Sequence, residues 1–351
     1  MYKIFAAYIF VLASTYCGVE MFRRWSLRRE ILDIPNNRSL HTTPIPRGGG
    51  LVIFLVSALT FLVYTLANGA AFYWAYFGGA AIVAVISLLD DVNPISPFLR
   101  ILFHSLAAAL VLWSLGGFRE VSIPFYGVVE TGWWGVGLTF LWIVWLINSY
   151  NFMDGIDGIA AMQAITAGAG WCLTGWLLGI EEAGFFGGVL AMSALGFLML
   201  NWQPAKIFMG DVGSAFLGYS FAVLPLLALH TTRRSGLESS MPWIAVLLVW
   251  FFVFDSVFTF LKRLVRGEKV WQAHREHIYQ KMVLAGMSHR AVTCLYGFGS
   301  ALTVLFLCLS LKYSHSLNET VLNAVLCETI LLIALWQIVV RAKPGSVGVD
   351  K

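Results

Sequence analysis

The sequence predicts an all-α membrane protein with about eleven transmembrane helices. Hydrophobic residues make up 59% of its 351 residues and charged residues 12%, and the mean hydropathy is +0.77. Soluble proteins carry about 25% charged residues, so the expected solvent of this chain is the bilayer. Apolar runs of spanning length predict helices at residues 2–22, 51–67, 72–89, 101–116, 133–148, 159–179, 185–200, 215–230, 241–261, 291–311 and 319–340.

The basic residues predict how these helices are oriented. With a periplasmic N-terminus, 18 Lys and Arg residues lie on the cytoplasmic side and 5 lie outside. The positive-inside rule therefore places the N-terminus in the periplasm and the C-terminus in the cytoplasm. Because the cations are divided among short loops, we expect no nucleic-acid partner. We predict one polytopic membrane domain over residues 1–351, in which the first apolar run is kept as a span.

Polar residues that can carry chemistry gather in the predicted cytoplasmic loops. These loops cover residues of about 23–50, 90–100, 148–158, 201–214 and 262–290. The outer loops hold nothing comparable. Ionisable residues at a membrane boundary are costly and usually mark a site, so the one-sided enrichment predicts a single active site at the cytoplasmic face.

The segment at 151–158, Asn-Phe-Met-Asp-Gly-Ile-Asp-Gly, interrupts two long apolar runs. Its carboxylates, Asp154 and Asp157, are three residues apart and would share one face if the segment opened a helix. Such a pair can share a divalent cation through oxygen ligands. The alternative is an ordinary polar turn between two spans. Because comparable clusters recur on the same predicted side, we favour a cation site.

Asp90 and Asp91 end the third predicted span, just before Pro94 and Pro97. The prolines stop the helix, so both carboxylates lie in its last turn, where the helix dipole disfavours negative charge. A compensating cation or a proton transfer would explain the pair. We therefore favour a functional role for these two acids.

Two further loops combine glycines with cations. Arg47 precedes three glycines that open the second span, where exposed backbone N–H groups can bind phosphate, although a structural hinge explains the glycines equally well. Asp211 lies between glycines before the eighth span, and Ser214 is a candidate cap for that helix. In the same loop Lys206 supplies a positive charge, and Phe208 could stack on a planar ring or rest on lipid headgroups.

The last loop contains His274-Arg275-Glu276-His277, which suits phosphate binding or acid–base work. The alternative is an amphipathic helix drawn to anionic lipid. Asp255 lies about two turns inside the ninth predicted span. There we expect a satisfied hydrogen bond between helices rather than a functional acid.

Carboxylates for a divalent metal, glycine-rich turns and a cationic loop at one membrane face together favour phosphoryl transfer. The reaction would join a soluble phosphate compound to one dissolved in the bilayer. A secondary transporter of a phosphorylated or anionic solute is the alternative from a different class. Transporter sites lie near the bilayer midplane, whereas these acids cluster at one interface, which argues for the enzyme.

Five motifs occur in order between residues 33 and 280: Asp33-Ile-Pro-Asn with Pro-Arg-Gly-Gly-Gly, Asp90-Asp91, Asn151-Phe-Met-Asp-Gly-Ile-Asp-Gly, Phe208-Met-Gly-Asp-Val-Gly-Ser and His274-Arg-Glu-His. They resemble the motifs of the polyprenyl-phosphate N-acetylhexosamine-1-phosphate transferases, the bacterial glycosyltransferase 4 family, whose eleven-span layout also matches. The resemblance implies transfer of an N-acetyl amino-sugar 1-phosphate from a UDP-sugar to undecaprenyl phosphate in the bacterial inner membrane. UMP would be released, and the lipid-diphosphate-sugar would initiate O-antigen or a related cell-envelope polysaccharide.

The resemblance also implies the site residues. Catalytic roles would fall to Asp90, Asp91, Asp154 and Asp157, the first two at the lipid phosphate. Mg²⁺, with Mn²⁺ as an expected substitute, would be held by Asp211 with help from Asp154 and Asp157. The resemblance further implies uracil stacking near Phe208, and His274, Arg275 and His277 at the diphosphate or the sugar. From the loop residues themselves we also expect Arg47, Asn151 and Lys206 to bind substrate.

One departure from the family's pattern concerns the sugar. After His277 the chain continues Ile-Tyr-Gln-Lys, where many members that use N-acetylglucosamine have more His and Arg. This favours members that start O-antigen chains, some of which use 6-deoxy amino sugars. Phe152-Met153 argues against the peptidoglycan branch, which normally has Leu-Thr there. The amino sugar itself and a homodimeric state are left open.

Overall fold

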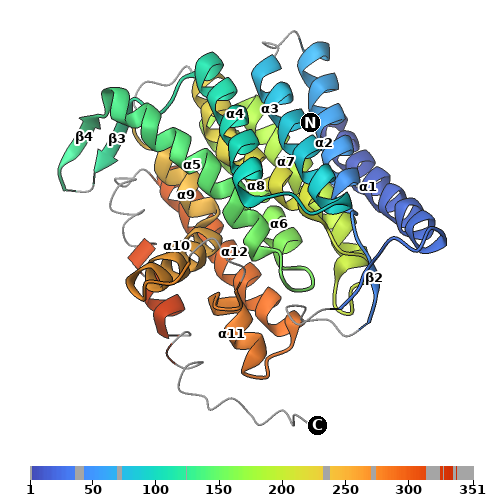
Figure 1. Cartoon of the computed structure of the whole chain (residues 1–351). Helices are drawn as coiled ribbons and strands as arrows, with labels where there is room; N and C mark the ends of the chain where they lie inside the picture. Colours follow the sequence, from blue (N-terminus) through green and yellow to red (C-terminus); the bar gives the residue numbers. More distant parts are fainter. Residues whose placement is uncertain are drawn as a thin grey trace.

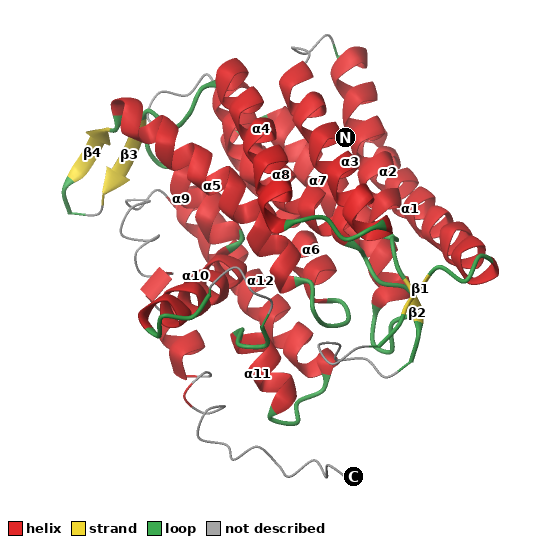
Figure 2. Ribbon diagram, viewed as in Figure 1, coloured by secondary structure: helices red, strands yellow, loops and turns green. Residues whose placement is uncertain are grey.

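The computed structural model describes residues 2–35, 43–68, 73–123, 125–231, 238–269, 274–313, 325–326, 328–334 and 337. Over these residues the chain is almost entirely helical, with two small antiparallel sheets of two strands each (Figures 1 and 2). The predicted all-α class is therefore confirmed. Residues 36–42 of the first predicted loop and 270–273 of the last lie outside the described part of the chain.

The helices are α1 (Tyr2–Arg28), α2 (Gly50–Ala67), α3 (Trp74–Val92), α4 (Pro97–Leu115), α5 (Gly132–Met153), α6 (Ile159–Leu178), α7 (Glu181–Asn201), α8 (Asp211–Thr231), α9 (Met241–Leu248), α10 (Trp250–Val265), α11 (Ile278–Leu284) and α12 (His289–Tyr313). β1 (Leu32–Asp33) pairs with β2 (Ile45–Pro46), and β3 (Glu120–Ile123) pairs with β4 (Gly127–Glu130).

Eight of the described helices are long and apolar enough to cross a membrane, namely α1 to α5, α7, α8 and α12. This is the pattern of a multi-pass membrane protein. α6 occupies the place of the sixth predicted span but is not among the eight; it is rich in Gly, Ala and Thr, and neighbouring helices bury much of it. Most of residues 319–340, the eleventh predicted span, fall outside the described residues.

The ninth predicted span is wrong as a single straight helix. α9 and α10 are separated at Val249 and bent by 81°. A break of this kind frees backbone carbonyls that a continuous helix would use, and Gln163 of α6 donates to one of them, the Leu248 carbonyl, at 2.9 Å. Apolar residues continue through the bend, so the pattern in the sequence does not reveal it.

α8 is the most deeply buried of the membrane-length helices, and it packs against α2, α3, α5 and α7. Aromatic contacts hold it to α3: the ring of Tyr219 lies 5.6 Å from that of Tyr76, and its hydroxyl donates to the Tyr76 carbonyl at 2.9 Å. The first residue of α8 is Asp211. This predicted metal ligand is therefore attached to one of the best-packed elements of the protein.

The loops alternate between the two ends of the helix bundle. The loops before α2, between α3 and α4, between α5 and α6, and before α8 lie at one end, where α11 is also found, while the β3–β4 hairpin lies toward the other (Figure 1). The structure thus brings the predicted site loops together. That this end faces the cytoplasm stays a prediction.

Candidate active site

Arg47 joins two of the predicted carboxylates. Its Nη2 atom lies 2.9 Å from Asp91 Oδ1 and 2.5 Å from Asp211 Oδ1. These side chains come from the loop before α2, the last turn of α3 and the first residue of α8. A cation expected beside the two acids at the end of α3 is therefore supplied by the chain itself.

Asp91 also caps α8. Its carboxylate accepts hydrogen bonds from the backbone amides of Asp211 at 3.0 Å and Val212 at 3.3 Å. A helix dipole favours negative charge at the N-terminus and disfavours it at the C-terminus. The Asp91 carboxylate is therefore unfavourable at the C-terminal end of α3, to which it belongs, and favourable beside the N-terminus of α8. The prediction that Ser214 caps this helix is wrong. α8 begins at Asp211, and the Ser214 hydroxyl donates within the first turn to the Gly210 carbonyl.

Asp90 is held by groups to which the sequence analysis gave no role. Its carboxylate accepts hydrogen bonds from the Ile95 amide at 2.7 Å and from Arg100 Nη1 at 2.6 Å. Arg100 Nη1 is also 3.6 Å from Asp211 Oδ2, so Asp211 lies between two guanidinium groups. A signal for Arg100 was present in the sequence, because a cation at the start of an apolar span directly follows the loop with two acids.

The three glycines after Arg47 do not offer their amides to a ligand. Those of Gly48 and Gly49 donate to the Phe208 carbonyl at 3.1 and 3.0 Å, and that of Gly50 donates to the Met209 carbonyl at 2.8 Å. Since each amide is already satisfied by backbone, the phosphate-cradle hypothesis for these glycines is wrong and the structural alternative holds. Their role is to join the loop before α2 to the loop before α8.

Asp154 and Asp157 lie in a turn and not on a helix face. α5 ends at Met153 and α6 begins at Ile159, after Gly158 with a φ of +77°. The hypothesis that the two acids share one face of an opening helix is therefore wrong. The reason is local: glycine adopts this left-handed backbone readily, so the turn forms at Gly158 and delays the helix.

Asp157 is fixed by partners from the loop before α8 and from the start of α12. Its carboxylate accepts the Ala205 amide at 3.2 Å and lies 3.4 Å from Nδ1 of His289, the first residue of α12. Thr293 of the same helix donates to the Asp157 carbonyl at 2.8 Å. His289 was missed by the sequence analysis. Its signal was weak, because it follows the last catalytic motif and no neighbouring acid marks it.

The Asp154 carboxyl is a perturbed acid beside this cluster. Burial is the main cause that raises its pKa to about 7. Arg47 lowers the pKa, and the carboxylates of Asp211, Asp91 and Asp157 raise it. Within the cluster itself, the guanidinium groups of Arg47 and Arg100 contact the three carboxylates of Asp90, Asp91 and Asp211, so formal negative charge exceeds positive charge there.

The other predicted residues of these loops differ in how closely they join the cluster. Asn151 Nδ2 donates to the Ser214 hydroxyl at 3.1 Å, which ties the end of α5 to the start of α8. Phe208 is half-buried, and its backbone pairs with that of Arg47. Lys206 is exposed. Asn151 and Phe208 thus help to hold the site loops together, whereas Lys206 is accessible to solvent.

The loop at 274–277 lies beside these elements. His277 Nδ1 is 3.1 Å from Asp255 Oδ1, and the rings of His274 and His277 are 4.9 Å apart. Burial, with the nearby positive charge of Arg263 adding to it, lowers the pKa of His274 to about 4. Arg275 is half-buried. The prediction that Asp255 is a hydrogen-bonded acid between helices is confirmed.

A cavity of about 680 Å³ extends to Arg100 and to the loop at 274–277. Its lining is mostly apolar and comes from α4, α5, α9 and α10, with Trp142, Trp145 and Phe260 among the larger side chains. Its polar lining residues are Arg100, Asn148, Ser149, Ser256, Arg263, His274 and His277. Arg100 therefore lines the cavity and contacts the acids at the same time.

The described side chains of the site do not enclose a metal ion by themselves. Among the described residues, no group of three or more His, Cys, Asp or Glu side chains could hold one. Mg²⁺ is usually bound through one or two carboxylates, with waters and substrate phosphates completing its coordination. Asp211, at the centre of the cluster, can provide one such carboxylate.

The comparisons with known proteins agree with this architecture. The family model of glycosyl transferase family 4 matches residues 73–229. A probable undecaprenyl-phosphate N-acetylglucosaminyl 1-phosphate transferase from Bacillus subtilis (strain 168) is 33% identical over 308 residues, which cover 85% of this chain and 83% of that protein. A decaprenyl-phosphate N-acetylglucosaminephosphotransferase from Mycobacterium leprae (strain TN) is 30% identical, covering 83% of this chain and 81% of that protein.

A phospho-N-acetylmuramoyl-pentapeptide-transferase from Listeria monocytogenes serotype 4b (strain CLIP80459) is more distant, with 24% identity over 88% of this chain and 98% of that protein. The relatives from Bacillus and Mycobacterium match over most of the length of both chains. The chain belongs to glycosyl transferase family 4, the polyprenyl-phosphate hexosamine-1-phosphate transferases that its motifs resemble.

Proposed function

We propose that the protein transfers an N-acetyl amino-sugar 1-phosphate from a UDP-sugar to undecaprenyl phosphate, with release of UMP. One observation carries the proposal: Arg100 lines the apolar cavity and also contacts Asp90 and Asp211 in the cluster of acids. A lipid tail in the cavity would bring its phosphate to the point where a polar, Mg²⁺-dependent site can receive a nucleotide-sugar. An apolar pocket ending in a few converging polar groups is the usual form of such a binding site.

The cavity is suited to the lipid acceptor. Its wall consists of apolar side chains of α4, α5 and α10, and its polar residues include Arg100 and Arg263. Guanidinium groups bind phosphate in a bidentate geometry, so Arg100 would hold the phosphate headgroup while the polyprenyl tail of the lipid lies along the apolar wall. Asp90 orients Arg100 through the contact at 2.6 Å and thus acts on the lipid phosphate through that cation.

The excess of negative charge around Asp154 and Asp211 suits a divalent cation, and we propose Mg²⁺ there, with Mn²⁺ as a substitute. Asp211 would be the main ligand, with Asp154 and Asp157 in support. When bound, Mg²⁺ neutralises charge on the diphosphate of the nucleotide-sugar. Arg47 lies 2.5 Å from Asp211, so it holds this carboxylate in place and adds positive charge on the same side.

The nucleotide-sugar would lie between the loop before α8 and the loop at 274–277. Phe208 offers a ring for uracil, Lys206 a charge at the accessible edge, and Asn151 a carboxamide at the end of α5. His274, Arg275 and His277 would meet the diphosphate or the sugar. Because His274 is uncharged at neutral pH, Arg275 is the cation expected to offset the charge of the leaving UMP.

We favour direct attack of a lipid phosphate oxygen on the sugar-bearing phosphorus. The bond from this phosphorus to the bridging oxygen breaks, and UMP leaves. Asp90 and Asp91 are poor candidates for a nucleophile because each is engaged by two or more donors, Asp90 by Ile95 and Arg100 and Asp91 by Arg47 and the start of α8. A phosphate monoester is mostly ionised at neutral pH, so it needs positioning more than deprotonation.

A panel of UDP-sugar donors tests which amino sugar the protein transfers. UDP-N-acetylglucosamine is the first to test, because relatives from Bacillus and Mycobacterium are named for this sugar. A 6-deoxy amino sugar is the alternative raised by the residues after His277. The product would initiate O-antigen or a related envelope polysaccharide at the bacterial inner membrane, with the site at its cytoplasmic face.

The test uses purified protein in lipid nanodiscs with Mg²⁺, undecaprenyl phosphate and each UDP-sugar. We expect release of UMP and a lipid-diphosphate-sugar with at least one donor, and a loss of roughly a thousandfold or more in Asp211→Asn. Glu130→Gln, the same kind of change on β4 at the other end of the bundle, is the matched control and should keep full activity. Absence of product with every donor, or normal turnover by folded Asp211→Asn, would overturn the proposal.

Labelled UMP separates the two mechanisms. Direct attack predicts that no label enters the UDP-sugar in delipidated protein until lipid phosphate is added. Exchange without lipid would instead show a covalent phospho-sugar enzyme. In that case Asp90 or Asp91 would have to be the nucleophile.

A further inference from the structure

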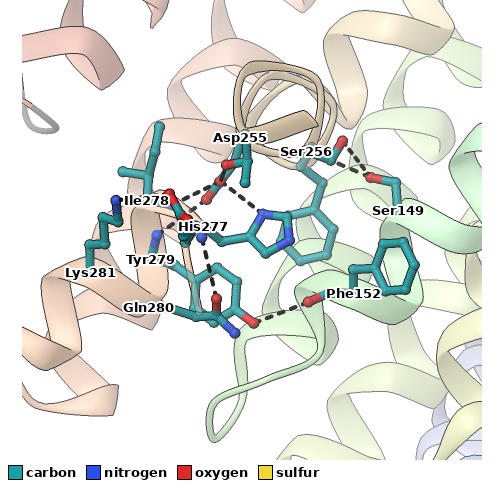
Figure 3. A network of polar contacts seen from close by, with 12 residues as sticks. Ser149, Phe152, Asp255, Ser256, His277, Ile278, Tyr279, Gln280 and Lys281 are labelled. Atoms are coloured by element: carbon teal, nitrogen blue, oxygen red, sulfur yellow. Dashed lines mark hydrogen bonds and ion pairs between the residues drawn. The ribbon is translucent and has the colours of Figure 1, made fainter. Parts of the chain in front are cut away.

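Asp255 is a fully buried acid in α10 that accepts five hydrogen bonds. Figure 3 shows it at the centre of a polar network that joins α10 to the loop at 274–277. Its donors are the Thr259 hydroxyl at 3.2 Å, His277 Nδ1 at 3.1 Å, the Ile278 amide at 2.9 Å, the Tyr279 amide at 3.2 Å and the Tyr296 hydroxyl at 2.8 Å. A carboxylate surrounded by backbone amides acts as the acceptor in each contact.

This contact decides which nitrogen of His277 carries the proton. Because Asp255 accepts, Nδ1 of the neutral ring is the donor, and Nε2 is left with its lone pair. Figure 3 shows Nε2 directed away from Asp255, on the side of Ser149 and Phe152. His277, Ser149 and Phe152 all line the cavity. Nε2 is therefore the ring nitrogen of His277 on the side of these cavity-lining residues.

We propose that Asp255 is a positioning residue that fixes the ring orientation and tautomer of His277, so that Nε2 presents a hydrogen-bond acceptor to the cavity. This inference rests on the proposed function. An acceptor selects an O–H or N–H group of a substrate and disfavours an anionic oxygen. Its ligand is therefore a hydroxyl or acetamido N–H of the sugar, or the residual proton of the lipid phosphate.

The surrounding network explains why the pair is held rigidly. Asp255 accepts hydrogen bonds from the backbone amides of Ile278 and Tyr279, which belong to the first turn of α11. The Tyr279 hydroxyl donates to the Phe152 carbonyl at 3.1 Å and so connects the same network to the loop at 151–158. Asp255 thus has a structural role as well, and a test must separate the two.

The first measurement does not depend on activity. In protein labelled with ¹⁵N-histidine, the His277 signals, assigned by their loss in His277→Gln, should show the Nδ1–H tautomer. In Asp255→Asn the amide competes for this position, and the Nε2–H tautomer should become populated. A wild-type His277 in the Nε2–H form, or a tautomer unchanged in Asp255→Asn, would overturn the inference.

The second measurement is a double-mutant cycle on turnover. Asp255→Asn and His277→Gln should each lower it by roughly tenfold or more, and the double variant should lose little beyond either one, because Asp255 acts through His277. Thr259→Val and Tyr296→Phe each remove one other bond to the same carboxylate and should keep turnover within about threefold of wild type. Additive losses, or equal losses in Tyr296→Phe, would show an anchoring role alone and overturn the inference.

The KM values identify the group that Nε2 meets. A rise confined to the UDP-sugar assigns the contact to the sugar, and a rise confined to undecaprenyl phosphate assigns it to the lipid phosphate. If wild-type protein transfers no phospho-sugar, the proposed function fails, while the tautomer measurement still decides whether Asp255 orients His277.

Discussion

Neutralising Asp154 is expected to stabilise the protein in the absence of metal and substrate. The Asp154 carboxyl has a pKa of about 7 against an ordinary value of 3.8, mainly because burial disfavours its charge; Arg47 lowers this pKa, and the negative charges of Asp211 and Asp91 raise it. Among the described residues, its side chain makes no hydrogen bond. Asp154→Asn therefore removes a charge without removing a contact.

The sign and size of the effect follow from proton binding. The folded protein keeps the proton on Asp154 up to a pH of about 7, whereas the unfolded chain loses it near pH 3.8. In this window the unfolded state binds fewer protons, so the free energy of unfolding falls as pH rises, and the loss is complete above pH 7. A displacement of about three pH units corresponds to at most about 4 kcal/mol. Since the side chain keeps some contact with water, we expect about 1–3 kcal/mol, or a rise in Tm of roughly 2–8 °C.

The assay is thermal unfolding, followed by tryptophan fluorescence, of detergent-purified protein with EDTA at about pH 5 and pH 8. Asp154→Asn should exceed wild type at the higher pH, and the gain should shrink at the lower one. Asp157→Asn is the matched control. Its carboxylate accepts the Ala205 amide at 3.2 Å, so this variant should be less stable than wild type. No gain for Asp154→Asn at the higher pH, or an equal gain at both, would refute the reasoning.

Three further predictions concern other parts of the site. Gly50→Ala should lose most of its folded yield in size-exclusion chromatography, because the new Cβ would lie 2.3 Å from Gly213 Cα, whereas Gly137→Ala meets open space and should not. The pKa of His274 is about 4 against an ordinary value of 6.5, so the unfolded chain binds more protons than the folded protein between these pH values, and the free energy of unfolding falls as pH drops from 6.5 to 4. His274→Gln removes this group, so thermal unfolding should show a smaller drop in Tm over the same pH range. Arg100→Ala should raise the KM for lipid phosphate roughly tenfold and that for UDP-sugar less; equal rises would contradict its place at the cavity.

The membrane class and the site loops could be predicted from the sequence because both depend on local composition. Runs of apolar residues identify spans by length alone, and acids such as Asp91 and Asp211 stand out because an isolated charge beside hydrocarbon is costly. The same locality limited the prediction. The bend at Val249 left no mark, since apolar residues continue through it, and the turn at Gly158 appeared as the start of a helix.

Only the tertiary structure decided which partners the site residues have. The Asp91 carboxylate accepts a hydrogen bond from the Asp211 amide, 120 positions away in the sequence. The Asp157 amide donates to Nδ1 of His289, 132 positions away. No periodic pattern encodes such pairs, because hydrogen bonding depends on the distance and direction between atoms and not on separation along the chain. The sequence by itself predicted that acids, cations and glycines would meet at one face, and the structure places them at one end of the helix bundle. Packing of the helices decided that Asp91 caps α8, that Arg100 joins the cavity to the acids, and that Asp255 contacts His277.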